Sequence, residues 1–208
     1  MNVSMNAPDT GDVPVVPPLS ARIVTERLVL RPPRTADVPR VRQALRKNSS
    51  HLRPWSPAPL PGEDPASLTS VSRTVLRDRT GWRRGERFAL LVFAREHETV
   101  VIGRVTLGGV LRGVFQNAYL GYWVDAEHQG RGLMTEAVRA TTTFAFTAAR
   151  LHRVQAAVMP GNAASRRVLE KAGYRQEGFA CRYLCIAGKW SDHVLFAVTT
   201  EEWSALLV

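Results

Sequence analysis

Cysteine, lysine and long apolar runs are all scarce in this chain of 208 residues. The two cysteines, Cys181 and Cys185, lie in one apolar segment with no matching Cys or His pair nearby. A zinc site needs about four such ligands, so no metal is expected. No apolar run approaches the roughly 18 to 20 residues that cross a bilayer. The first residues also lack the basic start and apolar stretch of a secretory signal, so we expect a cytoplasmic protein without a membrane segment.

Because only three residues are lysine, arginine supplies nearly all of the positive charge. Lysine and arginine together number 28 against 18 acidic residues, a net charge of +10. Such a balance attracts anionic partners, and RNA, a ribosomal surface or a phosphorylated cofactor would each qualify. The basic residues are scattered rather than gathered in one run, which argues against a dedicated nucleic-acid module. An arginine-rich surface without a partner explains the charge equally well.

The length suits one domain plus a tail. Residues 1–20 show no periodicity and are expected to be a mobile tail, with a single domain over residues 21–208. Apolar and β-branched runs predict strands at 22–33, 87–95, 99–110, 117–125, 153–159, 179–187 and 190–199. Helical spacing predicts helices at 35–48, 67–80, 133–148, 162–173 and 200–207. This order describes a mixed α/β (α+β) domain.

Three local details accompany these predictions. Thr35 is the expected N-cap of the first helix. Val71, Val75 and Leu76 are expected to face inward from the second helix. The proline-dense residues 49–67 between these helices are expected to form an irregular loop.

The segment EHQGRGLMTEAV, residues 127–138, places Gly130 and Gly132 between a predicted strand and a predicted helix. The start of a helix presents unpaired N–H groups and a positive dipole end, and glycine lets a phosphate approach the backbone closely. The pattern therefore favours an anion site. It lacks the Gly-Lys-Ser/Thr ending of a P-loop and the glycines of a dinucleotide fingerprint. A tight turn alone would explain the two glycines equally well.

A second segment, NAASRRVLEKAGY, begins the helix that follows the next strand. Asn162 offers both a donor and an acceptor at the helix start, and Ser165 lies one turn further on. By themselves, Asn162 is typical of an N-cap and Ser165 of a neutral helix residue.

Together, QGRGLM and NAASRRVLEKAGY resemble the GNAT superfamily of acetyl-CoA-dependent N-acetyltransferases. The segments TERLVLRPPRTAD, HLRPW, LGYWVD and GKWSDHVLFA are similar to its RimJ/RimL branch, which acetylates the N-termini of ribosomal proteins. The resemblance covers residues 22–199. It implies a mixed, mostly antiparallel central sheet of about seven strands, flanked by helices and splayed between the fourth and fifth strands.

The resemblance also implies acetyl-CoA as cosubstrate and a set of residues that contact it. Strand 120–124 would separate from strand 153–159 to admit the pantetheine arm, and Asn162 would hold a pantetheine amide. Gln129 and Gly132 match the diphosphate loop of the family, whereas Met134 departs from its last position. Arg166 and Lys171 are further candidates for the phosphates. The implied cofactor-binding residues are Trp123, Val124, Gln129, Gly130, Arg131, Gly132, Leu133, Met134, Asn162, Ser165 and Arg167.

For catalysis the resemblance gives an incomplete set. Many relatives carry a tyrosine seven residues after the asparagine as acid toward the leaving thiolate, but this chain has Leu169 there. In the RimJ/RimL branch the serine three residues after the asparagine replaces it, here Ser165. Tyr122 is a candidate proton relay, as is Tyr183. Asp125, His128, Glu136 and Glu177 lie near the cofactor segments in sequence, and none is favoured as a general base.

For the acceptor, the resemblance points to Trp55, beside His51 and Arg53. Trp190 and Asp192 lie at the start of the last predicted strand, where Asp192 would either receive a cationic amine or cap the turn at residues 189–191. A protein α-amine has a pKa near 7.8 and a lysine near 10.4, a difference of about 3.5 kcal/mol in deprotonation. An α-amine acetyltransferase can therefore work mainly by positioning and oxyanion stabilisation. The leading hypothesis is direct attack by a protein N-terminus, for instance of a ribosomal protein, on acetyl-CoA in a ternary complex. The alternatives are a small-molecule amine acetyltransferase and a non-catalytic CoA- or RNA-binding module, with the chain a monomer or a homodimer.

Overall fold

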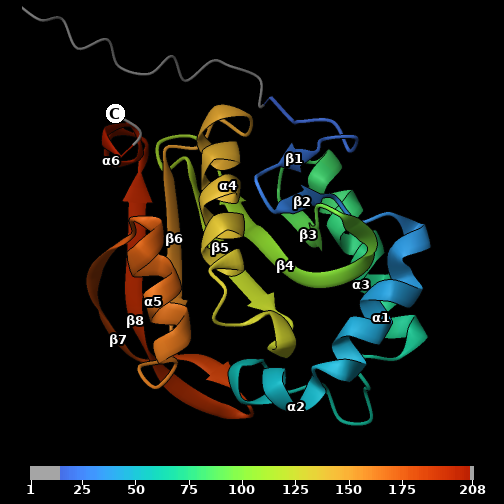
Figure 1. The fold of residues 1–208 in the computed structure, drawn as a ribbon. Coiled ribbons are helices and arrows are strands. Elements are labelled where there is room, and N and C mark those ends of the chain that lie inside the picture. Colours follow the sequence, from blue (N-terminus) through green and yellow to red (C-terminus); the bar gives the residue numbers. More distant parts are fainter. Residues whose placement is uncertain (1–14, 207–208) are drawn as a thin grey trace, which may run out of the picture.

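The computed structural model describes residues 15–206 and contains one eight-stranded sheet in the order β1-β2-β3-β4-β5-β6-β8-β7 (Figure 1). Neighbouring strands pair antiparallel except β5 and β6, which are parallel. The predicted mixed, mostly antiparallel sheet is confirmed. The strands are β1 (Ile23–Val24), β2 (Leu28–Arg31), β3 (Phe88–Ala94), β4 (His97–Leu111), β5 (Asn117–Val124), β6 (Arg153–Val158), β7 (Arg175–Ile186) and β8 (Lys189–Thr199).

The sheet has one strand more than expected because the first predicted strand folds back on itself. Ile23 pairs with Leu30 across a tight turn. The hydroxyl of Thr25 accepts a hydrogen bond from the N–H of Leu28 at 3.0 Å, and the N–H of Thr25 donates to the Leu28 carbonyl. These bonds close the turn, and one expected strand becomes the β1–β2 hairpin.

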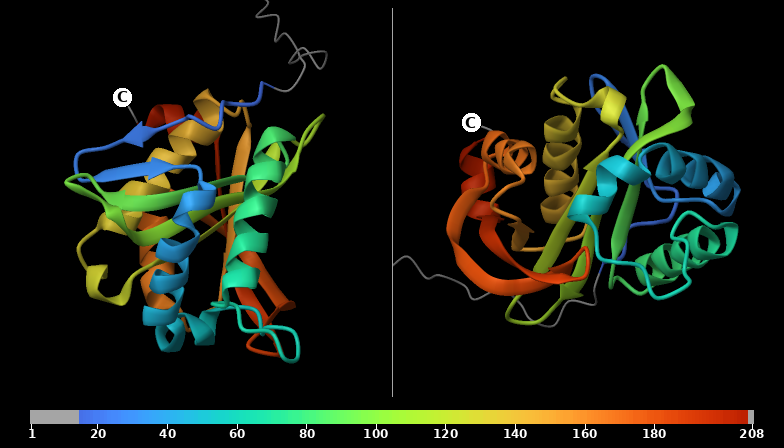
Figure 2. Two further views of the ribbon diagram at one scale, coloured as in Figure 1. Left: turned by 90° about the vertical axis from the view of Figure 1, so that its right-hand side faces the viewer. Right: turned by 90° about the horizontal axis from the view of Figure 1, so that it is seen from below.

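Helices cover both faces of the sheet (Figure 2). Successive residues of β2 alternate between two cores: Leu28 and Leu30 pack with α4, and Val29 packs with α1 and α3. The α-helices are α1 (Val38–Lys47), α2 (Ser49–Leu52), α3 (Leu68–Arg83), α4 (Leu133–Thr147), α5 (Ala163–Ala172) and α6 (Thr200–Ala205). The 3-10 turns are η1 (Thr35–Asp37), η2 (Arg53–Trp55) and η3 (Ala126–His128).

Three local predictions were wrong. Thr35 does not cap α1, because residues 35–37 form η1 and the helix begins at Val38. The first part of the expected irregular loop is helical: it forms α2 and η2, and η2 includes Pro54. Leu76 is 55% exposed, because it lies on the side of α3 opposite the buried Val71 and Val75.

The expected boundary between tail and domain also needs correction. The buried Pro17 accepts a hydrogen bond at 2.6 Å from the indole N–H of Trp82, itself a fully buried core residue. Val16 and Leu19 pack against the same core. Residues 16–19 are therefore held by the domain, and the rest of the expected tail, residues 1–14, lies outside the described residues.

The predicted splay of the sheet is confirmed, now between the fifth and sixth strands. β5 and β6 pair only from Asn117↔Arg153 to Tyr119↔Gln155. Beyond that point β6 continues alongside β8, while residues 120–124 of β5 stay with β4. The opening faces the start of α4 and α5. In residues 15–206 we find no helix with the length and apolarity of a membrane span, and no cluster of three or more potential metal ligands.

Candidate active site

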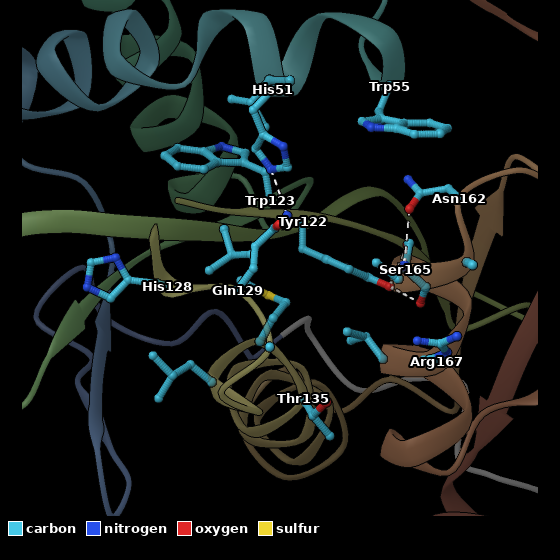
Figure 3. A pocket seen from close by; sticks show the side chains of 18 of the residues that line it. His51, Trp55, Tyr122, Trp123, His128, Gln129, Thr135, Asn162, Ser165 and Arg167 are labelled. Carbon is cyan, nitrogen blue, oxygen red and sulfur yellow. Dashed lines mark hydrogen bonds between the residues drawn. The ribbon is translucent and has the colours of Figure 1, made fainter. Parts of the chain in front are cut away.

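A cavity of about 920 Å³ occupies the opening between β5, α4, α5 and α2 (Figure 3). It is lined by predicted catalytic, cofactor-binding and acceptor residues from four separate stretches of the chain, together with the further candidates His51, His128 and Lys171. The predicted residues are Trp55, Tyr122, Trp123, Val124, Gln129, Gly130, Gly132, Leu133, Met134, Asn162, Ser165 and Arg167. The fold thus brings most of the predicted site together.

One wall of the cavity is the start of α4 together with the residues before it, 129–132, which we call the glycine loop. Gly130 and Gly132 take left-handed backbone angles, with φ of 72° and 75°. Gly132 is the N-cap, has no side chain to cap the helix, and its carbonyl receives the N–H of Glu136. The preceding N–H groups of residues 133–135 therefore have no partner within the helix. Their presence at a cavity wall suits an anion, as predicted.

The position of this loop is set by Arg27, on the β1–β2 hairpin. Its guanidinium donates to the Arg131 carbonyl at 2.9 Å and to the Glu136 carboxylate at 2.7 Å. The pKa of Glu136 is lowered: burial opposes ionisation, but hydrogen bonds from Thr25 and Arg27 outweigh it. Glu136 therefore anchors the loop as a carboxylate and is not available as a base.

The two predicted catalytic residues are in direct contact. The Tyr122 hydroxyl donates to the Ser165 carbonyl at 2.9 Å, and it lies 2.9 Å from the Ser165 hydroxyl (Figure 3). Asn162 caps α5 by accepting the N–H of Ser165 at 3.1 Å, which holds the serine in place. Burial raises the pKa of Tyr122 well above its usual value, although the Ser165 hydrogen bond opposes this. The tyrosine therefore keeps its proton and can donate it.

The side of the cavity that the family resemblance assigns to the acceptor is formed by α2 and η2, which carry His51 and Trp55. We call this side the acceptor wall. The Nε2 atom of His51 lies 2.9 Å from the side-chain amide nitrogen of Gln129, so this wall touches the glycine loop. The carbonyl of Ser56 accepts the N–H of Ala187, in the turn between β7 and β8, at 2.9 Å. The β7–β8 hairpin therefore lies against the same wall.

Apart from the acidic candidates for a base, six predicted or candidate site residues do not line the cavity among the described residues: Arg53, Arg131, Arg166, Tyr183, Trp190 and Asp192. Arg131 is exposed and contributes its carbonyl to Arg27. Trp190 is 68% exposed near the hairpin end. Asp192 accepts the N–H of Arg182 at 2.7 Å, where β7 is irregular and Arg182 has a φ of 50°. That bond gives Asp192 a role in the hairpin instead of the expected turn cap.

The remaining candidate bases are Asp125, Glu177 and His128. Asp125 and Glu177 are both engaged in ion pairs, Glu177 with Arg153 and Arg175. Burial would raise the pKa of Asp125, but hydrogen bonds from Asn48, His128 and Lys47 outweigh it and hold the pKa far below its usual range. His128 lines the cavity and bonds to Asp125 at 3.0 Å, yet in Figure 3 its ring lies well apart from Tyr122 and Ser165.

No aspartate or glutamate lines the cavity in the described part of the chain, whereas His51, His128, Arg167 and Lys171 all do. Asp125, Glu136 and Glu177, the carboxylates considered as bases, are each paired with a cation. Leu169, at the position where relatives carry tyrosine, is fully buried in the core. The described lining therefore offers hydroxyl groups, amides, backbone N–H groups and two imidazoles, but no carboxylate.

Several lining residues were missed by the sequence analysis. Leu52, Ser56, Thr135, Gly161 and Val168 contribute to the wall. Thr135 follows the glycine loop directly and Gly161 precedes Asn162, so a wider window around each motif would have found them. Leu52 and Ser56 carry no comparable signal, because the loop that holds them is placed by long-range contacts.

The acceptor wall is fixed to the glycine loop by Asn48, which is almost fully buried. Its amide donates to Asp125 at 2.8 Å and to the Ala44 carbonyl at 2.9 Å, and its oxygen accepts the Ala126 N–H at 2.8 Å. All of its polar atoms are therefore satisfied. Asn48 joins the end of α1 to the turn before the glycine loop.

We expect Asn48→Asp to destabilise the protein by about 3 kcal/mol, because a second buried carboxylate would then face Asp125. For a chain of this size the thermal midpoint should fall by roughly 6–12 °C. The difference in thermal midpoint between this variant and wild type should narrow as the pH falls, since the new carboxyl group then becomes protonated and can donate a hydrogen bond to Asp125. Calorimetry at several pH values checks this, with the exposed Gln43→Glu as control. Equal midpoints for the two variants would contradict the role of Asn48.

Comparison with known proteins agrees with this geometry. Residues 27–175 match the family described as Acetyltransferase (GNAT) domain. Over 102 residues, the chain is 48% identical to Probable N-acetyltransferase YjcK of Bacillus subtilis, a match spanning 49% of this chain and 56% of that protein. Over 183 residues it is 34% identical to the ribosomal protein uS5-alanine N-acetyltransferase of Escherichia coli, covering 88% of this chain and 93% of the relative.

Among solved structures, Mycobacterium smegmatis RimJ in complex with CoA-disulfide is similar, with a TM-score of 0.79 and 33% identity. The alignment covers 86% of this chain and 88% of that one. The chain belongs to the GNAT acetyltransferase family. Within it, the chain is an N-acetyltransferase of the RimJ type.

Proposed function

We propose that this enzyme transfers the acetyl group of acetyl-CoA to the α-amine of a protein N-terminus, by direct attack in a ternary complex. One observation carries the choice of acceptor: no carboxylate lines the described cavity, which holds two histidines, an arginine and a lysine. Such a cavity disfavours a cationic amine and accepts a neutral one. A protein α-amine, with a pKa near 7.8, is neutral far more often than a lysine side chain near 10.4.

The residues around the cavity suit acetyl-CoA. The N–H groups at the start of α4 would hold the diphosphate, supported by Arg167 and Lys171, which also line the cavity. The amide NH2 of Asn162 has no acceptor in the described chain, because only its oxygen is used to cap α5. It would hold a carbonyl of the pantetheine arm. The relative RimJ was solved with CoA-disulfide, which supports this assignment.

Acetyl-CoA supplies a thioester, which an amine attacks at its acetyl carbon with release of the CoA thiol. The free backbone of β5 at Trp123 and Val124, where β6 has separated, would orient the carbonyl and stabilise its developing charge. Tyr122 would deliver a proton toward the leaving sulfur, and Ser165 would orient the tyrosine hydroxyl. The attacking nitrogen loses one proton as the amide forms; this proton would pass to water, and solvent would return a proton to Tyr122. A strong base is not required, since the acceptor enters neutral.

The E. coli relative is named for the alanine of ribosomal protein uS5. We therefore propose that the acceptor is a ribosomal protein with a small N-terminal residue, which the enzyme would encounter in the cytoplasm. A small-molecule amine is the runner-up, and the cationic cavity weighs against polyamines and aminoglycosides. A non-catalytic CoA- or RNA-binding module would release no thiol with any amine.

Thiol release from acetyl-CoA distinguishes these functions. The acceptors are peptides beginning with Ala, Ser, Met or Glu, the same peptides with a blocked N-terminus, and free amines including spermidine and an aminoglycoside. We expect turnover only with free N-termini. Turnover confined to small amines would overturn the proposal in favour of a metabolic or resistance enzyme.

The pH dependence of kcat/KM should be set by the ionisation of the acceptor α-amine and not by a group of the enzyme. With a peptide acceptor, kcat/KM should fall about tenfold per pH unit below the pKa of its α-amine, near 7.8, and reach a plateau above it. Acceptors with a less basic α-amine should shift the curve to lower pH by the same amount. A curve with the same midpoint for every acceptor would instead identify an ionising group of the enzyme, such as His51 or His128.

A further inference from the structure

The outward side of α3 carries a row of arginines. Arg73, Arg77, Arg83 and Arg84 are exposed and lie opposite the buried Val71, Val75 and Trp82. The helix contains one acidic residue, Asp78, which is buried and paired with Arg87 and Arg104. The exposed side of α3 therefore carries positive charge with no acidic residue of its own.

Helix α1 lies beside α3 (Figure 2). Its exposed basic residues continue the positive surface. Arg40, Arg46 and Lys47 are exposed on it, and the helix contains no acidic residue. A groove of about 570 Å³ on α1 and the start of α3 is lined by Pro39, Arg42, Gln43, Arg46, Lys47 and Leu68. It has three cations and no anion among the described residues. We call the outward surface of α1 and α3 the α1–α3 face.

Ion pairs neutralise only part of this face. Arg40 pairs with Asp37, Lys47 with Asp125 and Glu127, and Arg73 with Glu63. Arg46, Arg77, Arg83 and Arg84 have no carboxylate within ion-pair distance in residues 15–206. Four uncompensated guanidinium groups on two adjacent helices repel one another and attract polyanions.

The spacing of these charges suits a chain of phosphates more than a single anion. At 1.5 Å of rise per residue, Arg77 and Arg84 are separated by about 10 Å along the helix, too far for one phosphate to contact both. A nucleic-acid backbone presents a phosphate every few ångströms and gains affinity from each one that is neutralised. A membrane-binding helix would also need bulky aromatic anchors, whereas this face exposes only Leu68 and Leu76.

The face is also next to the acceptor wall. Lys47, in the groove, is followed at once by Asn48 and α2, which carries His51 into the cavity. Polyanion bound along α1 would therefore end close to the acceptor side of the cavity. From this arrangement we infer that the α1–α3 face docks the enzyme on an RNA phosphate backbone. The docking itself stands apart from the proposed function; its use in presenting an RNA-associated protein N-terminus rests on that function.

The test uses the full chain, a fluorescein-labelled RNA hairpin and anisotropy over a range of salt concentrations. The variant is the triple Arg77→Gln, Arg83→Gln, Arg84→Gln. The matched control, Arg95→Gln, Arg139→Gln, Arg182→Gln, removes the same charge from exposed positions outside the face. Thermal unfolding and acetylation of a short free peptide are measured on all three proteins.

We expect the face variant to weaken RNA binding by more than about tenfold and to reduce the slope of log Kd against log salt by about two to three. The control should bind within about threefold of wild type, and peptide acetylation should be unchanged in both variants, since neither touches the cavity. Any of three results would overturn the inference. The face variant and the control could lose RNA binding equally, or wild type could fail to bind RNA at low salt. In a parallel assay with phosphatidylglycerol vesicles, the face variant could lose more vesicle binding than RNA binding. If wild type bound RNA but did not acetylate the free peptide, this would count against the proposed function and not against the RNA docking.

Discussion

Tyr122→Phe should lower kcat by about 100-fold, with little change in the KM for acetyl-CoA. The hydroxyl lies 2.9 Å from that of Ser165 on the wall where β5 and β6 separate, and burial keeps it protonated by raising the pKa of Tyr122. Phenylalanine preserves the ring and its packing but removes the proton donor. The loss should therefore appear in the chemical step and not in cofactor binding.

The companion variant is Ser165→Ala, which leaves the tyrosine bonded only to the Ser165 carbonyl. We expect a smaller loss, about tenfold, and a double variant close to Tyr122→Phe alone because the two hydroxyls act as one unit. Tyr174→Phe is the control: this buried tyrosine also has a raised pKa, through burial, and bonds to Thr142 at 2.7 Å, outside the cavity lining.

Steady-state thiol release with a fixed peptide measures all four variants. The control should lose stability but keep kcat within about twofold. If Tyr122→Phe and Tyr174→Phe behaved alike, the Tyr122–Ser165 pair would be structural and the proton would come from elsewhere. Strictly additive losses in the double variant would equally contradict a shared role.

Gly132→Asp should raise the dissociation constant for acetyl-CoA by about 100-fold, and Gly132→Asn by about tenfold. Both side chains must adopt the left-handed φ of 75°, which Asn and Asp tolerate better than other residues. The added Cβ would lie 3.6 Å from a nitrogen of Arg27, an ordinary contact, so steric cost is similar in the two variants. They differ in charge, and only the aspartate repels a diphosphate at the helix start.

Calorimetric titration of acetyl-CoA checks this, and raising the salt concentration should shrink the gap between Asp and Asn by screening. Gly113→Asp is the control, because Gly113 has a φ of 66°, open space around it and no place in the cavity lining. It should bind acetyl-CoA like wild type. If the Asp and Asn variants had the same affinity, the N–H groups at the start of α4 would not be the diphosphate site.

Local signals predicted the regular elements well. Strands β3 to β6 and helices α3 to α5 lie within a few residues of their expected positions, since apolar periodicity and turn residues are local features. The errors share a cause. The β1–β2 turn is closed by the bonds of Thr25 with Leu28, and η1 is held by the Asp37 carboxylate bonded to Arg31. Neither hydrogen bond has a periodic signature in the sequence.

The acceptor wall shows the same limit. Trp55 was predicted from the family resemblance, but nothing local indicates α2 or the contact of His51 with Gln129, which are 78 positions apart. Trp190 and Asp192 were predicted from their place at the start of the last strand, and they lie outside the described cavity lining. Asp192 lies in the expected hairpin, but its carboxylate accepts the backbone N–H of Arg182 at the β-bulge and does not reach the cavity lining.

The sequence by itself determined the glycine turn before α4 and the asparagine that caps α5, because helix starts, glycine backbone angles and N-caps are set by a few consecutive residues. Only the tertiary structure decided that Tyr122 meets Ser165, 43 positions away, and that no carboxylate lines the described cavity. Both depend on strand register and on ion pairs between distant segments: β5 leaves β6 after Tyr119, and Asp125, Glu136 and Glu177 bond cations elsewhere. A carboxylate turned toward an arginine from another strand or loop cannot be distinguished from a free one in the sequence.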